Sequence, residues 1–89
     1  MKPKSTRSRR FVAVEEEYSG YGSELGAATS EAKAALIAIG FALNGLKEGV
    51  RGARYFVIDT KTSETKEYIV DRQGRTTIHD ADPITEIKD

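Results

Sequence analysis

A run of apolar residues near the start of the chain predicts a buried strand over residues 10–18. Arg10 is followed by Phe-Val-Ala-Val, whose apolar side chains on both faces are typical of such a strand. They continue into three glutamates that we expect to face solvent. The Ser19-Gly20 pair predicts a turn. Residues 21–25 then form either a return strand or part of one long loop, and we favour the hairpin.

The next segment predicts an amphipathic helix over residues 31–48. Thr29 or Ser30 supplies the N-cap, Glu31 complements the helix dipole in the first turn, and Gly49 suits the left-handed conformation that ends many helices. Apolar residues recur at spacings of three and four, as expected for one buried face. They are Ala32, Ala35, Leu36, Ile39, Leu43 and Leu46.

Three shorter apolar runs, at residues 54–60, 65–70 and 76–79, predict an antiparallel meander after the helix. Asp82 and Pro83 then favour a short helix, with a loose tail as the alternative. The whole pattern predicts an α+β fold with a single long helix on one face of a mainly antiparallel sheet, in the order β(β)-α-β-β-β. We expect a basic disordered arm at 1–9, one domain at 10–82 and a tail or short helix at 83–89.

The opposite side of the helix lacks the charges of an ordinary surface helix. Ile37 and Phe41 lie there, one turn apart, beside a ridge of alanines that would let another helix approach closely. We expect either a broad core that includes this side, or an interface for a protein partner or a second copy of the chain. The candidate protein-binding residues are Ile37, Ala38, Phe41, Tyr55 and Tyr68.

Composition changes this picture through the distribution of charge. The 89 residues include 14 basic and 14 acidic side chains, but five of the basic ones and no acidic one lie in the first ten residues. Residues 11–89 therefore carry nine basic and fourteen acidic side chains, a formal charge of −5. The arm is either a solubilising tail or a nucleic-acid-binding segment, because clustered cations gain affinity by releasing phosphate counterions. Its cations are Lys2, Lys4, Arg7, Arg9 and Arg10.

Tyr55 and Tyr68 occupy neighbouring predicted strands, and their orientation bears on whether the chain binds nucleic acid. On an exposed sheet face they would stack nucleic-acid bases or bind a protein. Facing the core, they would pack against each other across the strands. The sequence leaves both orientations open.

A short part of the chain resembles the ribonuclease H family. The matching residues are Thr29-Ser30-Glu31-Ala32, Leu36 and Ala42-Leu43 in the helix, and Val57-Ile58-Asp59-Thr60 in the strand that follows, about a third of the chain. In that family a helix glutamate and a strand-ending aspartate bind magnesium, so the resemblance implies Glu31 and Asp59 as ligands of a metal-dependent nuclease. The family's first strand also carries an aspartate, whereas residues 11–14 contain no acid here. We keep this activity as a remote alternative.

The sequence offers little other chemistry. It contains no cysteine, which excludes disulfides and thiolate metal sites, and its single histidine is His79. We expect no catalytic residue, metal or cofactor, and a cytoplasmic protein without a membrane span. The sequence favours a non-catalytic protein–protein interaction module, by class analogy with small phage and mobile-element inhibitors that bind a host protein through a sheet or helix surface.

Overall fold

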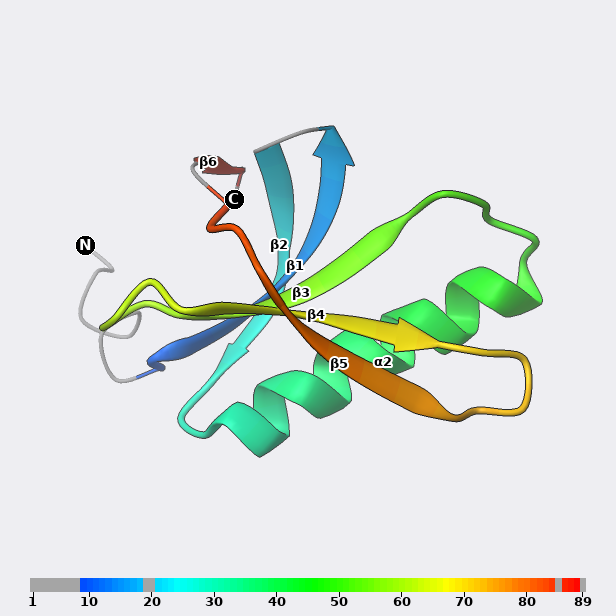
Figure 1. Ribbon diagram of the computed structural model, residues 1–89, viewed down its shortest axis with the longest axis horizontal. Helices are drawn as coiled ribbons and strands as arrows, with labels where there is room; N and C mark the ends of the chain where they lie inside the picture. Colours follow the sequence, from blue (N-terminus) through cyan, green and yellow to red (C-terminus); the bar gives the residue numbers. More distant parts are fainter. Residues whose placement is uncertain (1–8, 19–20, 85, 89) are drawn as a thin grey trace.

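The elements follow the predicted order, with one strand added at the C-terminal end. The computed structural model describes residues 9–18, 21–84 and 86–88. Its elements are β1 (Phe11–Tyr18), β2 (Tyr21–Ala28), α2 (Glu31–Lys47), β3 (Arg54–Asp59), β4 (Thr65–Val70), β5 (Thr76–Ala81) and β6 (Glu86–Lys88). The α+β class is confirmed, because one helix packs on a six-stranded, mainly antiparallel sheet (Figure 1). The favoured hairpin is also confirmed, with β2 as the return strand.

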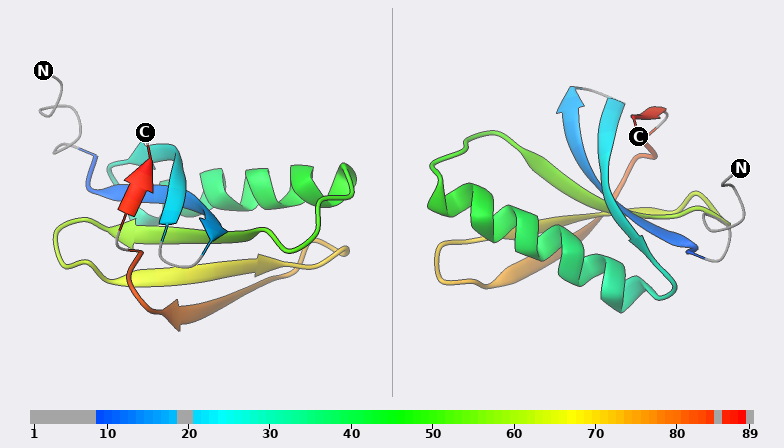
Figure 2. Two further views of the ribbon diagram at one scale, coloured as in Figure 1. Left: turned by 90° about the horizontal axis from the view of Figure 1, so that it is seen from above. Right: turned by 180° about the vertical axis from the view of Figure 1, so that it is seen from behind.

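The sheet has the order β5-β4-β3-β1-β2-β6, so the first strand lies inside the sheet and not at its edge. All neighbours are antiparallel except β2 and β6, which pair in parallel. In place of the short helix or loose tail expected at 83–89, Glu86–Lys88 forms β6. The pairing of β1 with β2 is interrupted by register shifts between Ala13 and Val14 and between Glu16 and Tyr18. Such bulges increase the local twist, and the β1–β2 hairpin crosses the β4–β5 hairpin steeply (Figures 1 and 2).

The helix begins and ends as its sequence dictates. Ser30 is the N-cap, and its hydroxyl oxygen accepts a hydrogen bond from the Lys33 backbone N–H at 3.2 Å. At the other end, the Glu48 backbone N–H donates to the carbonyl of Asn44 at 3.1 Å. Gly49 follows with a φ of +79°, a conformation that favours glycine and turns the chain toward β3.

The predicted buried face of the helix was wrong. The residues of α2 that are buried against the sheet are Ala34, Ala38, Ala42 and Gly45. By contrast, Leu36, which the periodicity assigned to the core, is 69% exposed. Ala35 and Ile39 are half-buried beside the core, whereas Ala32, Leu43 and Leu46 are exposed. The helix thus contacts the sheet through its smallest side chains, and the centre of this face is about 115° around the helix from the centre of the predicted face, at 100° per residue.

Side-chain size explains this orientation. The sheet supplies large residues under the helix, with Tyr55, Val57 and Tyr68 in one buried cluster with the alanines. Large side chains on both surfaces would hold the helix and sheet apart, whereas alanines let the helix approach the tyrosines of the sheet closely. The core under α2 is therefore built mainly from the sheet side.

The other face of the sheet has its own apolar cluster, formed by Val12, Val14 and Ile58. It is covered by the segment that leaves β5 and crosses the sheet to β6, and Ile84 of that segment packs on the cluster (Figure 1). This explains why the start of β1 is apolar at successive positions. The helix covers one face of β1, and the C-terminal segment covers the other.

Candidate functional site

The outward side of α2 presents an apolar surface in which Leu36 and Phe41 are exposed and Ile37 is half-buried against the core. Leu36, Ile37, Gly40, Phe41 and Asn44 line a shallow hollow there, and we call these five residues the helix outer patch. Phe41 is 46% exposed, and a Cβ atom on Gly40 would meet nothing within 4 Å. Exposed leucine and phenylalanine on one helix face are unusual for a surface helix, which normally carries charges there.

The structure brings together only part of the predicted protein-binding set. Ile37 and Phe41 both belong to the helix outer patch. Ala38 does not, because its side chain is fully buried against the sheet. Leu36 belongs to the patch but was assigned to the core by its spacing. The large tyrosines in the strands were the signal that the alanine ridge, and not the leucine stripe, would face the sheet.

The two tyrosines face the core and not the solvent. Tyr55 and Tyr68 are directly opposite each other on β3 and β4, and both are buried beneath α2. Burial raises the pKa of each phenol, with smaller contributions from Glu15 on Tyr55 and from Glu31 on Tyr68. The cross-strand packing interpretation is therefore confirmed. The suggestion that these tyrosines stack bases or contact a protein partner was wrong.

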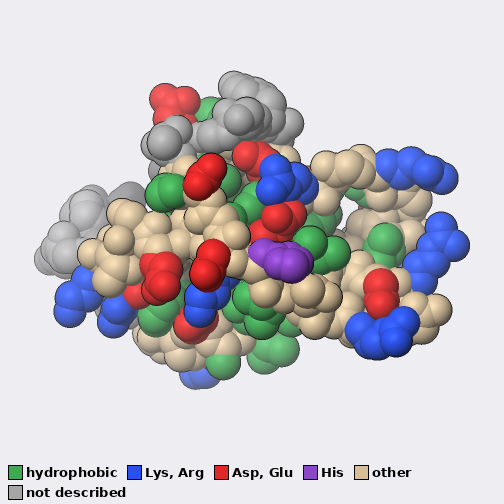
Figure 3. All heavy atoms as spheres, viewed as in Figure 1, with side chains coloured by type: hydrophobic (Ala, Val, Ile, Leu, Met, Phe, Trp, Pro, Cys, Tyr) green, Lys and Arg blue, Asp and Glu red, His purple; other side chains and the backbone are tan. Residues whose placement is uncertain are grey.

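The face of the sheet opposite the helix is acidic and is organised around Arg54. The Arg54 guanidinium donates to both carboxylate oxygens of Glu67 at 2.9 Å and to Glu16 at 3.2 Å. It also lies over the ring of Phe56, 5.2 Å from the ring centroid. The hydrogen bonds from Arg54 hold the pKa of Glu67 below its usual range. Figure 3 shows the acidic side chains of this face around the single histidine.

These acidic residues do not assemble into a metal site. His79 lies opposite Glu67 in the β4–β5 pair, and both the residue and its neighbour Asp80 are exposed. Within residues 9–18, 21–84 and 86–88, no three histidine, aspartate or glutamate side chains come close enough to hold an ion. Because Glu67 is already bound by Arg54, its carboxylate is also neutralised locally.

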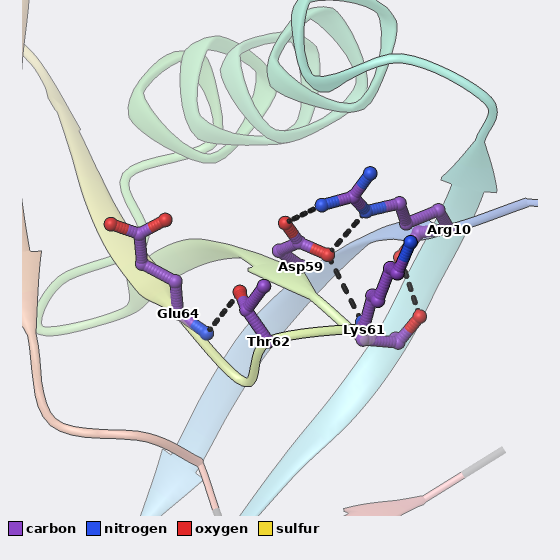
Figure 4. A network of polar contacts seen from close by, with 6 residues as sticks. Arg10, Asp59, Lys61, Thr62 and Glu64 are labelled. Carbon is purple, nitrogen blue, oxygen red and sulfur yellow. Dashed lines mark hydrogen bonds and ion pairs between the residues drawn. The ribbon is translucent and has the colours of Figure 1, made fainter.

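The two carboxylates that the ribonuclease H resemblance implied as ligands are each bound by a different cation. Asp59, at the end of β3, accepts two hydrogen bonds from Arg10, at 2.6 and 2.7 Å (Figure 4). Glu31, at the start of α2, forms an ion pair with Lys66 at 3.3 Å. β3, which ends at Asp59, pairs antiparallel with β1, the strand in which the ribonuclease H family would carry its first aspartate. The structure does not bring Glu31 and Asp59 into a common set of ligands.

Arg10 belongs to the folded domain and not to a free arm. Besides binding Asp59, its backbone carbonyl accepts hydrogen bonds from the Thr60 backbone N–H at 3.0 Å and from the Thr60 hydroxyl at 2.7 Å. Its guanidinium is therefore engaged within the domain, which corrects its assignment to a nucleic-acid-binding arm. Arg9 is exposed. The remaining predicted arm cations, Lys2, Lys4 and Arg7, lie outside the described residues.

We expect the Arg10–Asp59 pair to make stability depend on pH in the acid range. The hydrogen bonds from Arg10 are the main reason that the pKa of Asp59 falls to about 2. An unfolded aspartate has a pKa of about 3.9, so the stabilisation is complete above about pH 4 and is lost as the pH falls through the folded-state pKa. Replacing Arg10 by Gln should lower stability at neutral pH and flatten its decline between pH 4 and 2.

Urea unfolding across this pH range, with the Asp59 carboxyl shift followed by NMR, checks this expectation. Arg9→Gln is the matched control, since Arg9 is the exposed neighbour of Arg10. An Asp59 that titrates at its ordinary pKa in the wild type, or an Arg9→Gln variant that behaves like Arg10→Gln, would contradict it.

The helix of this chain is too short or too polar to cross a membrane, as judged over the residues that the structure describes.

Comparisons with known proteins add no assignment to these surfaces. No family model, curated protein or solved structure matches the chain.

Proposed function

We propose that the chain is a non-catalytic protein-interaction module that binds its partner through the helix outer patch. The observation that supports this most strongly is the orientation of α2 about its axis, which seats its alanines on the sheet and leaves Leu36 and Phe41 facing outward. Exposed apolar patches of this kind mark interaction sites in soluble proteins. Aromatic side chains near the centre of such a patch commonly supply much of the binding energy.

The charges around the patch specify the chemistry of the partner. Lys33 precedes Ile37 by one turn, and Lys47 follows Asn44 at the C-terminal end of the helix. Both lysines are exposed, but Glu48 lies beside Lys47 and its carboxylate accepts a hydrogen bond from the Asn44 amide at 3.4 Å, so the unbalanced cation of the border is Lys33. The complementary partner is a protein with an apolar surface that has an acidic residue at the edge facing Lys33, because opposite charges at an interface rim favour association and fix its register.

The test combines cross-linking with measured affinity. A photoreactive amino acid at position 41, compared with one at position 69, would capture the partner in cells that encode the chain. The partner is then purified, and its affinity is measured for the wild type and for the Leu36→Glu/Phe41→Glu variant. Because buried interface anchors each contribute about 2 kcal/mol or more, we expect the double variant to bind at least about 100-fold more weakly.

Ile69→Glu is the matched control. Ile69 is 46% exposed, as Phe41 is, but it follows Tyr68 on β4 and so lies on the other face of the sheet. Equal affinity of the wild type and the double variant would contradict the proposal. So would binding that survives the double substitution but is lost when residues 1–9 are deleted and weakens steeply with salt, since that result would indicate nucleic acid bound by the arm.

A further inference from the structure

The sheet ends in an open edge at β5. This strand pairs with β4 on one side, and no described residue pairs with its other side (Figure 2, left). Five of its six residues are exposed, and its pairing with β4 runs without a bulge from Thr76 to Ala81. The opposite edge, β6, has only three residues. An exposed edge strand is a template for another strand unless charged side chains, proline or a bulge block it. β5 has no lysine, proline or bulge, and its one acidic residue, Asp80, lies near its C-terminal end.

An apolar side chain lies at the centre of this edge. Ile78 is 53% exposed and faces the helix side of the sheet, opposite Tyr68 in the register. It borders a groove between α2 and β5 that Ala32, Ala35, Ile39 and Tyr68 also line. A strand added to β5 would cover Ile78 and extend the sheet along this groove.

The charges along β5 indicate which strand fits. Arg75 immediately precedes the strand, whereas Asp80 and Asp82 lie at its other end. Arg75 is held at its end by Asp71 of the same turn, at 3.0 Å. Antiparallel pairing of two copies keeps their acidic ends apart and places the acidic end of each copy beside the end of the other copy that begins at Thr76.

From this arrangement we propose that two copies of the chain associate by antiparallel pairing of their β5 strands. With Ile78 opposite Ile78 of the second copy, Thr76 lies opposite the second copy's Asp80. Opposite residues share a face of the sheet, so the Thr76 hydroxyl is placed to donate to the Asp80 carboxylate, whereas Arg75 lies opposite the second copy's Ala81 on the other face. A two-fold axis perpendicular to the sheet keeps Ile78 of both copies on the helix side. This is required because residues opposite each other in paired strands point to the same face of the sheet.

This association uses a surface separate from the helix outer patch and does not rest on the function proposed for that patch. It gives a continuous sheet through both copies and leaves Phe41 of each copy exposed. A register shifted by one residue would place Ile78 on the wrong face, and parallel pairing would place like charges side by side.

Sedimentation of the full chain over a broad range of concentration tests the proposal. We expect a reversible dimer in the wild type, and a dissociation constant at least about tenfold larger in Ile78→Lys, because lysine on an edge strand opposes pairing. Ile69→Lys is the control with similar exposure on the neighbouring strand, and Leu36→Glu/Phe41→Glu is the control for the helix. Both should dimerise as the wild type does.

A charge exchange makes the test independent of general loss of stability. Thr76→Asp should weaken the dimer, because it places two carboxylates opposite each other, and adding Asp80→Thr in the same chain should restore it, because each pair is again one threonine and one aspartate. A wild type that is monomeric at every concentration would overturn the proposal. It would also be overturned by a dimer that Ile78→Lys leaves intact, or by one that is lost only on substitution of Leu36 and Phe41.

Discussion

Replacing Phe56 by Ala is expected to lower the free energy of unfolding by about 3–5 kcal/mol, the usual cost of removing a fully buried aromatic side chain. Phe56 is 2% exposed although it lies on the face of the sheet opposite the helix. Val14 is its neighbour on β1, Arg54 covers its ring, and the segment that includes Ile84 lines the same hollow. The substitution therefore empties space that three separate parts of the chain enclose.

Urea unfolding followed by circular dichroism measures this loss. Ile69→Ala on β4 is the control, since its side chain is 46% exposed and its truncation should cost about 1 kcal/mol. Domains of this size have total stabilities of about 5–15 kcal/mol, so Phe56→Ala leaves little or no reserve. A loss from Phe56→Ala no larger than that from Ile69→Ala would contradict the position of the C-terminal segment over this face.

Replacing Ala38 by Leu is the second large effect that we expect, a destabilisation of about 1–3 kcal/mol from overpacking. Ala38 is fully buried between α2 and the sheet, in the same cluster as Tyr55 and Val57. Three added carbon atoms must push the helix away from the sheet or force side chains out of their rotamers. Helix propensity does not enter, because alanine and leucine are both strong helix formers.

The same substitution at Ala32 is the matched control, because Ala32 is an exposed residue of the same helix. We expect Ala32→Leu to change the free energy of unfolding by less than about 0.5 kcal/mol, as surface substitutions usually do. A stabilising Ala38→Leu, or a destabilising Ala32→Leu of similar size, would contradict the observed seating of the helix.

Local patterns in the sequence were sufficient to predict every element except β6. Ser30 and Gly49 bound the helix because capping chemistry is set by a few adjacent residues. The meander of β3, β4 and β5 follows from apolar runs separated by short polar turns. β6 was missed because three residues, Glu-Ile-Lys, are too few to give a strand signal, and their pairing with β2 depends on a crossing of the whole sheet.

The candidate site was harder to predict, because both sides of α2 are apolar. Periodicity identifies positions that share a face, but it does not say which of two apolar faces meets the sheet. That choice depends on residues distant in sequence, since Tyr55 and Tyr68 fill the space that leucines on the helix would otherwise need. The orientation of the tyrosines, which the sequence left open, depends on the same packing.

The outward orientation of the large apolar side chains of α2 is the central claim, and solvent paramagnetic relaxation of methyl groups tests it most directly. A soluble paramagnetic probe broadens the NMR signals of exposed methyl groups and leaves buried ones sharp. With Leu36 at 69% exposed and Ala38 fully buried, we predict strong broadening of the Leu36 methyls and none of the Ala38 methyl. Sharp Leu36 methyl signals together with a broadened Ala38 signal would contradict the structure of this helix and the interaction surface proposed from it.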